Sequence, residues 1–284
     1  MTTLLGAAEI RTIATRLDLH PAKSLGQNFV IDGNICRKIV RLAGVSVDDV
    51  ALEIGPGLGS LTLALLDEAA EVIAVEIDTR LAAQLPLTVD LHSENSANLT
   101  VINQDALRIS ELPKLPTILV ANLPYNISVP VLLHYLEIFQ SLRAGVVMVQ
   151  AEVADRLVAK PGTKDYGIPS LKAAWWAQMS HAGVVSRSVF WPTPNVDSKL
   201  ASFVRRPAPD SEEIRLIAFS AIDAAFSQRR KMLRSALSTW LGGSATTEAV
   251  LSKAKIDSTL RGETLVIEDY CAIARAVKEM GIEF

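Results

Sequence analysis

The chain has 284 residues, of which 49% are hydrophobic and 21% charged, the composition of an ordinary globular protein with one large domain or two unequal ones. Its two cysteines, Cys36 and Cys271, stand far apart, which excludes a disulfide framework and zinc-type cysteine spacing and fits a reducing cytoplasm. The net charge of −3 argues mildly against a nucleic-acid partner, although local basic patches, and not totals, bind phosphate.

The N-terminal region predicts two helices and no targeting segment. It lacks the basic start and long apolar run of a signal peptide, so we expect a cytoplasmic location and no membrane partner. The first helix is expected over about residues 7–17. The second should begin after Asp32, as its N-cap, and stop at Gly44. Between them lies a loop around Gln27.

A glycine-rich turn between a strand and a helix predicts a ligand site. Residues 50–54 read as a buried strand, the G-P-G-L-G run follows at residues 55–59, and a helix opens near Ser60, a plausible N-cap. Glycines let the backbone come close to a ligand, but dinucleotide enzymes use a related turn, so this signal alone is weak. Glu53, just before the turn, can accept a hydrogen bond from a ligand ammonium, which nicotinamide cofactors lack.

Two further acidic residues end the next two predicted strands. Glu76 closes the strand that begins at Glu71, and its distance from Glu53 is close to the offset at which an acid binds ribose hydroxyls. Asp105 follows the strand at residues 99–103 and can accept from an adenine amine. Each acid alone reads as a solvated loop residue or a helix cap. As a set at successive strand ends they indicate an adenosine-containing cofactor, and NAD remains possible at this point.

The run Asn122-Leu123-Pro124-Tyr125 closes another buried strand, at residues 117–121. Ligands bind at the carboxyl ends of strands in open α/β sheets. The Asn122 oxygen and a carbonyl beside Pro124 can grip the N–H bonds of an exocyclic amine and turn its lone pair toward an electrophile. Tyr125 offers a stacking face. The alternative is a strand followed by a proline-stiffened turn.

The C-terminal part predicts a change of architecture. A strand at residues 146–150 and a helix over about 151–159 are followed by a terminal antiparallel hairpin at 181–190 and 199–206. This hairpin places Phe190 at a loop mouth, where it can face Tyr125, although a strand-end core aromatic is the alternative. After a linker at residues 207–211 come only helical patterns.

The densest basic run lies in this helical part, at residues 225–234. Read as one helix, it stacks Arg230 and Arg234 one turn apart, with apolar residues on the opposing side. We expect an RNA-binding surface there, although a solvated basic face is an equal alternative. Its candidate residues are Arg229, Arg230, Lys231 and Arg234.

The predicted fold is therefore α/β, a doubly wound Rossmann-like domain at residues 1–207 with a smaller all-α domain at residues 208–284. The four histidines are scattered, so each is expected to be structural and no metal is expected. We expect a monomer.

In combination, four motifs resemble the ribosomal RNA adenine N6-dimethyltransferase family over nearly the whole chain. K-S-L-G-Q-N-F-V at residues 23–30 looks like the family's K-x-L-G-Q-N-F-L segment, with Val30 in place of the usual Leu. E-I-G-P-G at 53–57 matches the donor motif, N-L-P-Y-N-I-S at 122–128 the acceptor motif, and F-W-P-T-P-N-V-D-S at 190–198 the F-x-P-x-P-x-V-D-S segment.

This resemblance implies a methyltransferase domain that uses S-adenosylmethionine (SAM). Of the nearest relatives, enzymes that dimethylate two adjacent adenosines near the 3′ end of small-subunit rRNA look more similar than antibiotic-resistance enzymes acting on large-subunit rRNA. Small-subunit rRNA and its ribosomal particle would be the partners. The expected cofactor residues are Gln27, Asn28, Val30, Glu53, Gly55, Gly57, Glu76, Asp105 and Asn122. The expected catalytic residues are Asn122, Leu123, Pro124, Tyr125 and Phe190, with the last two clamping the target adenine.

Two alternatives stay open on the sequence. A DNA adenine methyltransferase can use similar chemistry, although no target-recognition domain interrupts the motifs. The other is a ribosome-assembly factor with an idle site, against which the intact acids and Asn122 argue.

Overall fold

The computed structural model describes residues 2–19 and 28–282, which form two compact units. Unit 1 contains residues up to Ala154 together with Met179–Arg205, and unit 2 contains Asp155–Gln178 and the chain from Arg206. The boundary after Arg205 lies near the predicted one at residue 207. Residues 155–178 group with the C-terminal helices, which the sequence did not indicate.

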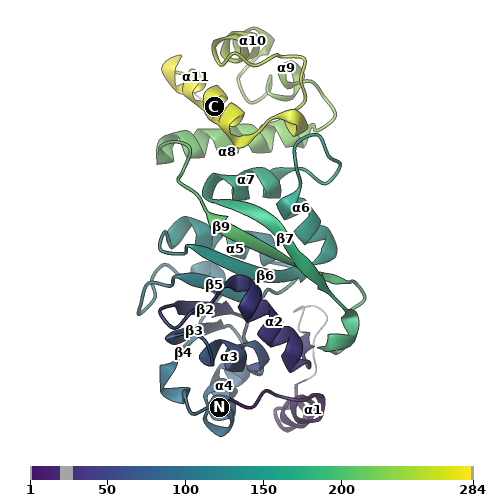
Figure 1. The fold of residues 1–284 in the computed structure, drawn as a ribbon. Helices are drawn as coiled ribbons and strands as arrows, with labels where there is room; N and C mark the ends of the chain where they lie inside the picture. The colour runs from purple at the N-terminus through teal and green to yellow at the C-terminus, as the bar shows by residue number, and fades with distance from the viewer. Residues whose placement is uncertain (1, 20–27, 283–284) are drawn as a thin grey trace. The chain divides into compact units, whose positions relative to one another are not determined.

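A seven-stranded sheet forms the centre of unit 1, in the order β4-β3-β2-β5-β6-β9-β7 (Figure 1). The first five strands in this order are parallel, and β9 runs antiparallel to β6. Their bounds are β2 Val50–Ile54, β3 Glu71–Glu76, β4 Leu99–Asn103, β5 Ile118–Asn122, β6 Ala144–Gln150, β7 Ala177–Val185 and β9 Ser198–Arg205. The predicted terminal hairpin is present as β7 and β9.

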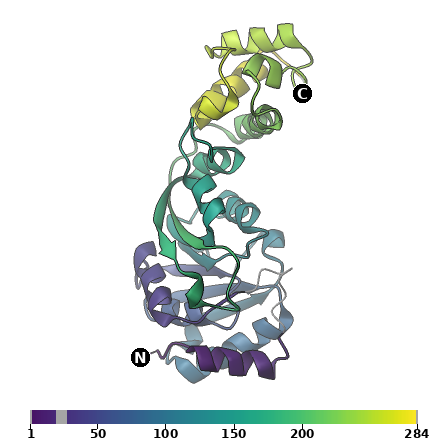
Figure 2. The same ribbon diagram turned by 90° about the vertical axis from the view of Figure 1, so that its right-hand side faces the viewer.

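Helices cover both faces of this sheet, as expected for a doubly wound fold. In Figure 1, α2 and α3 lie in front of the sheet and α5 lies behind it, and the turned view in Figure 2 agrees. Because both faces are covered, the central strands are nearly continuous apolar runs, and Val72 to Val75 are buried throughout. The helices of this unit are α1 Ala7–Arg16, α2 Gly33–Ala43, α3 Ser60–Leu66, α4 Thr79–His92 and α5 Ser128–Ile138, and α6 (Ala151–Val158) contains the boundary between the two units.

The second helix is capped as its sequence predicts. The Asp32 side chain accepts a hydrogen bond from the Asn34 amide, and Gly44 ends the helix in a left-handed conformation with φ of 69°. In α3, by contrast, the predicted N-cap is wrong. Gly59 is the N-cap, and Ser60 is the first helical residue.

A short two-stranded sheet lies beside the main one. It pairs β1 (Phe29–Val30) with β8 (Phe190–Trp191) in antiparallel register, with Val30 opposite Phe190. This ladder joins residues about 160 positions apart in the chain. This pairing determines where Phe190 lies.

Unit 2 is helical, as the sequence predicts, but its basic run is not one helix. Helix α8 ends at Ser227 and the next helix, α9, begins only at Leu233, so residues 228–232 of the run are not helical. The reason is backbone pairing: the amides of Leu233 and Arg234 donate to the carbonyls of Leu260 and Ser258. The helices of this unit are α7 Ile168–Trp176, α8 Glu212–Ser227, α9 Leu233–Ala236, α10 Ser244–Lys253 and α11 Ile267–Glu279. Across the described ranges, no helix combines the length and hydropathy needed to cross a bilayer.

Candidate active site

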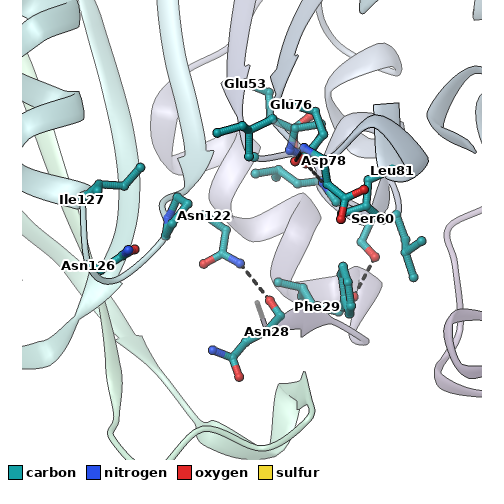
Figure 3. A pocket seen from close by; sticks show the side chains of 18 of the residues that line it. Asn28, Phe29, Glu53, Ser60, Glu76, Asp78, Leu81, Asn122, Asn126 and Ile127 are labelled. Atoms are coloured by element: carbon teal, nitrogen blue, oxygen red, sulfur yellow. Dashed lines mark hydrogen bonds between the residues drawn. The ribbon is translucent and has the colours of Figure 1, made fainter. Parts of the chain in front are cut away.

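A pocket of about 480 Å³ lies at the carboxyl ends of β2, β3 and β5 in unit 1 (Figure 3). Its volume falls within the range of small-molecule sites. All the predicted cofactor residues that the structure describes line it. They are Asn28, Val30, Glu53, Gly55, Gly57, Glu76, Asp105 and Asn122. Gln27 lies outside the described residues.

The glycine turn forms one wall of the pocket and is closely packed from behind. Gly57 and Gly59 have φ of 58° and 99°, which side chains rarely adopt. A Cβ at Gly57 would lie 3.0 Å from the Phe29 ring, so this glycine is also needed for space. The Ser60 hydroxyl donates to the Val30 carbonyl over 2.6 Å. The turn and β1 are thereby held together.

Glu76 organises the backbone around the pocket floor. Its carboxylate accepts from the Gly57 amide at 3.2 Å and from the Asp78 amide at 3.0 Å. The side chain is only 5% exposed, and burial raises its pKa above the ordinary value despite these hydrogen bonds. Glu76 thus ties the turn after β2 to the end of β3 and keeps an acidic side chain at the pocket.

Glu53 is buried more completely and is the most perturbed acid of the site. It is 1% exposed and accepts from the Thr62 hydroxyl at 2.6 Å. Burial, together with the neighbouring charge of Glu76, raises its pKa to about 8 even though the hydrogen bond from Thr62 acts in the opposite direction. A cation in the pocket would favour the ionised form of both carboxylates, so this end of the pocket suits an ammonium group.

The third acid lies at a more open part of the pocket. Asp105 accepts from the Leu107 amide at 3.0 Å and begins the 3₁₀ helix η3 (Ala106–Arg108). Beside it lie two apolar residues that the sequence reading missed, Ile77, which is 65% exposed, and Leu107, which is 38% exposed. Each follows an acid of a strand end by one or two positions, but this spacing alone does not distinguish a pocket residue from any other exposed apolar residue.

Asn122 ends β5 and points into the opposite side of the pocket, as Figure 3 shows. Its amide nitrogen donates to the Asn28 carbonyl at 3.2 Å, so its oxygen is the end left to accept from a ligand. Pro124, Asn126 and Ile127 continue this wall. Leu123 is buried beneath it, and its amide donates to the Met148 carbonyl at 3.1 Å.

The two predicted clamp residues occupy different environments. Tyr125 is half-buried, and its hydroxyl lies 2.8 Å from the Ser198 hydroxyl. Phe190 is only 2% exposed and belongs to the hydrophobic core with Val30, so its expected position at a loop mouth is wrong. The β1–β8 pairing pulls it inward. Neither ring is among the residues that line the pocket.

The predicted basic residues lie in unit 2 and divide into two kinds. Arg229 is engaged within the fold: it donates to the Glu263 carboxylate at 2.8 Å and to the carbonyls of Thr163 and Lys164. The other three have exposed side chains without a hydrogen bond or ion pair in the part of the chain that the structure describes. They are Arg230, Lys231 and Arg234.

Comparison with known proteins adds a family match and close relatives. The model of a family described as ribosomal RNA adenine dimethylase matches residues 20–279. A protein of Thermobifida fusca named ribosomal RNA small subunit methyltransferase A is 56% identical over 95% of both chains. The protein of the same name from Kineococcus radiotolerans is 53% identical over 96% of this chain and 92% of its own.

Solved structures show the same fold. A dimethyladenosine transferase from Plasmodium falciparum superposes with a TM-score of 0.76 at 24% identity, covering 90% of this chain and 99% of its own. The 23S rRNA methyltransferase ErmE superposes with a TM-score of 0.65, also at 24% identity, covering 88% of this chain and 99% of its own. At this identity the likeness concerns the fold alone.

Proposed function

The chain belongs to the ribosomal RNA adenine dimethylase family, and we propose that it uses SAM to dimethylate N6 of two adjacent adenosines in a hairpin loop near the 3′ end of small-subunit rRNA. It is a methyltransferase with a Rossmann-like fold. The observation that carries the proposal is the orientation of Asn122. Its nitrogen is occupied by the Asn28 carbonyl, which leaves its oxygen at the edge of a cofactor-sized pocket.

The hydrogen-bond acceptors of the pocket support SAM as the cofactor. When bound, SAM supplies a sulfonium methyl group, which is a strong electrophile. Glu53 and Glu76 are two buried carboxylates whose ionised forms need a nearby cation or hydroxyl donors, and this suits the ammonium and ribose of SAM. Asp105, beside the exposed Ile77, suits the amine and the flat face of an adenine ring.

The acceptor side of the pocket orients an amine and does not need to ionise it. The Asn122 oxygen and a carbonyl beside Pro124 accept from the two N–H bonds of adenine N6 and turn its lone pair toward the methyl group. The residues contribute mainly by placing the reacting atoms about 3–3.5 Å apart and in line. Tyr125 stacks on the target base once it has left its helical stack. The proton is lost after transfer, when the N6 group has become acidic.

RNA binding is proposed for the exposed cations of unit 2. Arg230, Lys231 and Arg234 are free to contact phosphates, which dominate the affinity of proteins for RNA. Arg229 is better described as a residue that holds unit 2 together, because its guanidinium is occupied by Glu263 and two carbonyls. The small ribosomal subunit is the proposed particle, and the chain is proposed to act as a monomer in the cytoplasm.

The test of this function is the Asn122→Ala variant. Removing the amide should lower the rate constant of single-turnover methylation of undermethylated small subunits by at least about 100-fold, the cost of losing one preorganised polar contact. Particle binding should change by less than about tenfold, because the phosphate contacts remain. The assay must saturate SAM, since Asn122 also lines the donor pocket.

The matched control is Asn98→Ala, which removes an exposed amide away from the pocket and should leave the rate unchanged. Near-normal methylation by Asn122→Ala would refute the mechanism. If cells that carry the inactive variant mature their ribosomes normally, the role of the protein in assembly is one of binding.

A further inference from the structure

Ser198 is a buried hydroxyl that lies at the catalytic edge of the sheet. It is the first residue of β9 and pairs with Gln150, the last residue of β6. It has no exposed surface, and its hydroxyl lies 2.8 Å from the hydroxyl of Tyr125. Tyr125 follows β5, which is the next strand on the other side of β6. The acceptor motif and the start of β9 are thus joined by one side-chain hydrogen bond.

The backbone on the N-terminal side of Ser198 makes several contacts, and the residues after it pair with β6. The Ala151 amide donates to the carbonyl of Asp197 at 2.9 Å, and the carboxylate of Asp197 pairs with Arg187 at 3.0 Å. Arg187 also donates to the Asn195 carbonyl. These contacts give Ser198 a defined position, so it can act as a fixed partner for a less constrained side chain.

Tyr125 is such a side chain. It is half-buried and belongs to a turn outside the sheet, in which the Ile127 amide donates to the Pro124 carbonyl at 3.2 Å. The phenol hydroxyl is held only by Ser198 among the described residues. Without that partner the ring can rotate or tilt, because an unpaired buried hydroxyl costs free energy that is recovered when it moves to bond water. The direction in which Tyr125 presents its face therefore depends on Ser198.

We propose that Ser198 is a positioning residue for methyl transfer, which acts by holding the Tyr125 ring in the orientation that stacks on the target base beside Asn122. This inference rests on the proposed function. The physical reason is that a stacking ring that is free to tilt restrains the target base poorly. A reacting amine displaced by about 1 Å from its position in line with the methyl group can lose about 100-fold in rate. Ser198 itself touches neither substrate nor cofactor in this account.

The test compares Ser198→Ala, Tyr125→Phe and the double variant by single-turnover methylation under saturating SAM. Each single variant should lower the rate constant by about tenfold, the scale of one orienting hydrogen bond. The double variant should be no slower than either single variant, because both remove the same bond. SAM affinity should stay within about twofold of wild type, since neither residue lines the donor pocket.

The control is Ser202→Ala, four residues further along β9, which removes a hydroxyl that donates to the Ser180 carbonyl. It should methylate at the wild-type rate. A purely structural role for Ser198 would lower the amplitude, which counts folded enzyme, and leave the rate constant unchanged. An unchanged rate constant for Ser198→Ala, with or without a loss of amplitude, would overturn the proposal. Losses that multiply in the double variant would overturn it too. Absence of methylation by the wild-type protein would instead refute the proposed function.

Discussion

Burial determines the behaviour of the two carboxylates at the closed end of the pocket. Glu53 and Glu76 are 1% and 5% exposed and lie close enough for the charge of Glu76 to raise the pKa of Glu53. An unfolded chain would hydrate both groups, so the folded state retains protons on Glu53 at pH values where the unfolded chain has released them. The stability of the protein must therefore depend on pH through this pair.

The first prediction concerns this pH dependence. The pKa of Glu53 is raised from 4.5 to about 8 on folding, so its contribution to stability is complete below pH 4.5 and is lost as the pH rises through 8. Relative to Glu53→Gln, the free energy of unfolding of the wild type should fall as the pH rises through this window by up to about 5 kcal/mol, at 1.36 kcal/mol per pKa unit.

Urea unfolding of both proteins at pH 5, 6.5 and 8 measures this difference. Gln is a fitting control residue because its carbonyl can still accept from Thr62. If the free energy of unfolding changed with pH by the same amount in both proteins, Glu53 would not be protonated in the folded state over this range.

The three acids and Asn122 could be predicted because each is a polar residue at the end of an apolar strand, and parallel strand ends converge. Ile77 and Phe190 could not be placed in the same way. An exposed Ile looks like any surface residue until the neighbouring strand ends are known. The burial of Phe190 depends on pairing with Val30, a contact across 160 residues that no local pattern carries.

At the level of elements, tertiary pairing overrides helix periodicity in the basic run. Helix α8 stops at Ser227, because the backbone beyond it pairs with residues 258–260. The helical period of residues 225–234 was real in the sequence, but it described side-chain types and not backbone partners. Arg229 consequently points to Glu263 and not along a helix face.

The second prediction follows from this division of roles. Arg229→Gln should lower the stability of the protein by about 1 kcal/mol, because a partly buried ion pair and two hydrogen bonds to carbonyls are lost. Arg230→Gln should leave stability within about 0.5 kcal/mol of wild type, the usual range for a surface change. Urea unfolding monitored by Trp fluorescence compares them. Equal destabilisation by both changes would contradict the assignment.

At the scale of the whole molecule, the net charge of −3 argued against a nucleic-acid partner. The chain nevertheless belongs to a family of rRNA methyltransferases. Membership removes the NAD and DNA alternatives that the sequence left open. The net charge is a sum over the whole chain, and it also counts acids such as Glu53 and Glu76 that are buried and do not face a partner. The doubly wound architecture, by contrast, could be predicted from the alternation of strands and helices, and the structure confirms it.

The third prediction measures this local charge. Changing Arg230, Lys231 and Arg234 together to Gln should weaken RNA binding and lower the slope of log affinity against log salt by about 2, since fewer counterions are released. SAM affinity should stay constant, because none of the three lines the pocket. Fluorescence anisotropy with an rRNA hairpin at several salt concentrations gives the slope.

The control has the same change in net charge at another surface. Arg11, Lys38 and Arg41 are exposed on α1 and α2, and their joint change to Gln should reduce the slope much less. Equal slopes for the two triple variants would mean that total charge, and not the cations of unit 2, sets RNA affinity.

The short segment at β1 is hydrogen-bonded to both sides of the pocket, and this has a consequence for how the binding of two ligands is linked. The carbonyl of its neighbour Asn28 accepts a hydrogen bond from Asn122, on the side of the pocket proposed for the target amine. The carbonyl of Val30 accepts from Ser60, on the side proposed for SAM, and Val30 also pairs with Phe190. A ligand that fixes the position of this strand from one side of the pocket therefore fixes it for the other side as well. By linkage, any factor by which SAM changes the affinity for RNA is also the factor by which RNA changes the affinity for SAM, so the size of this coupling is the same whichever of the two binds first.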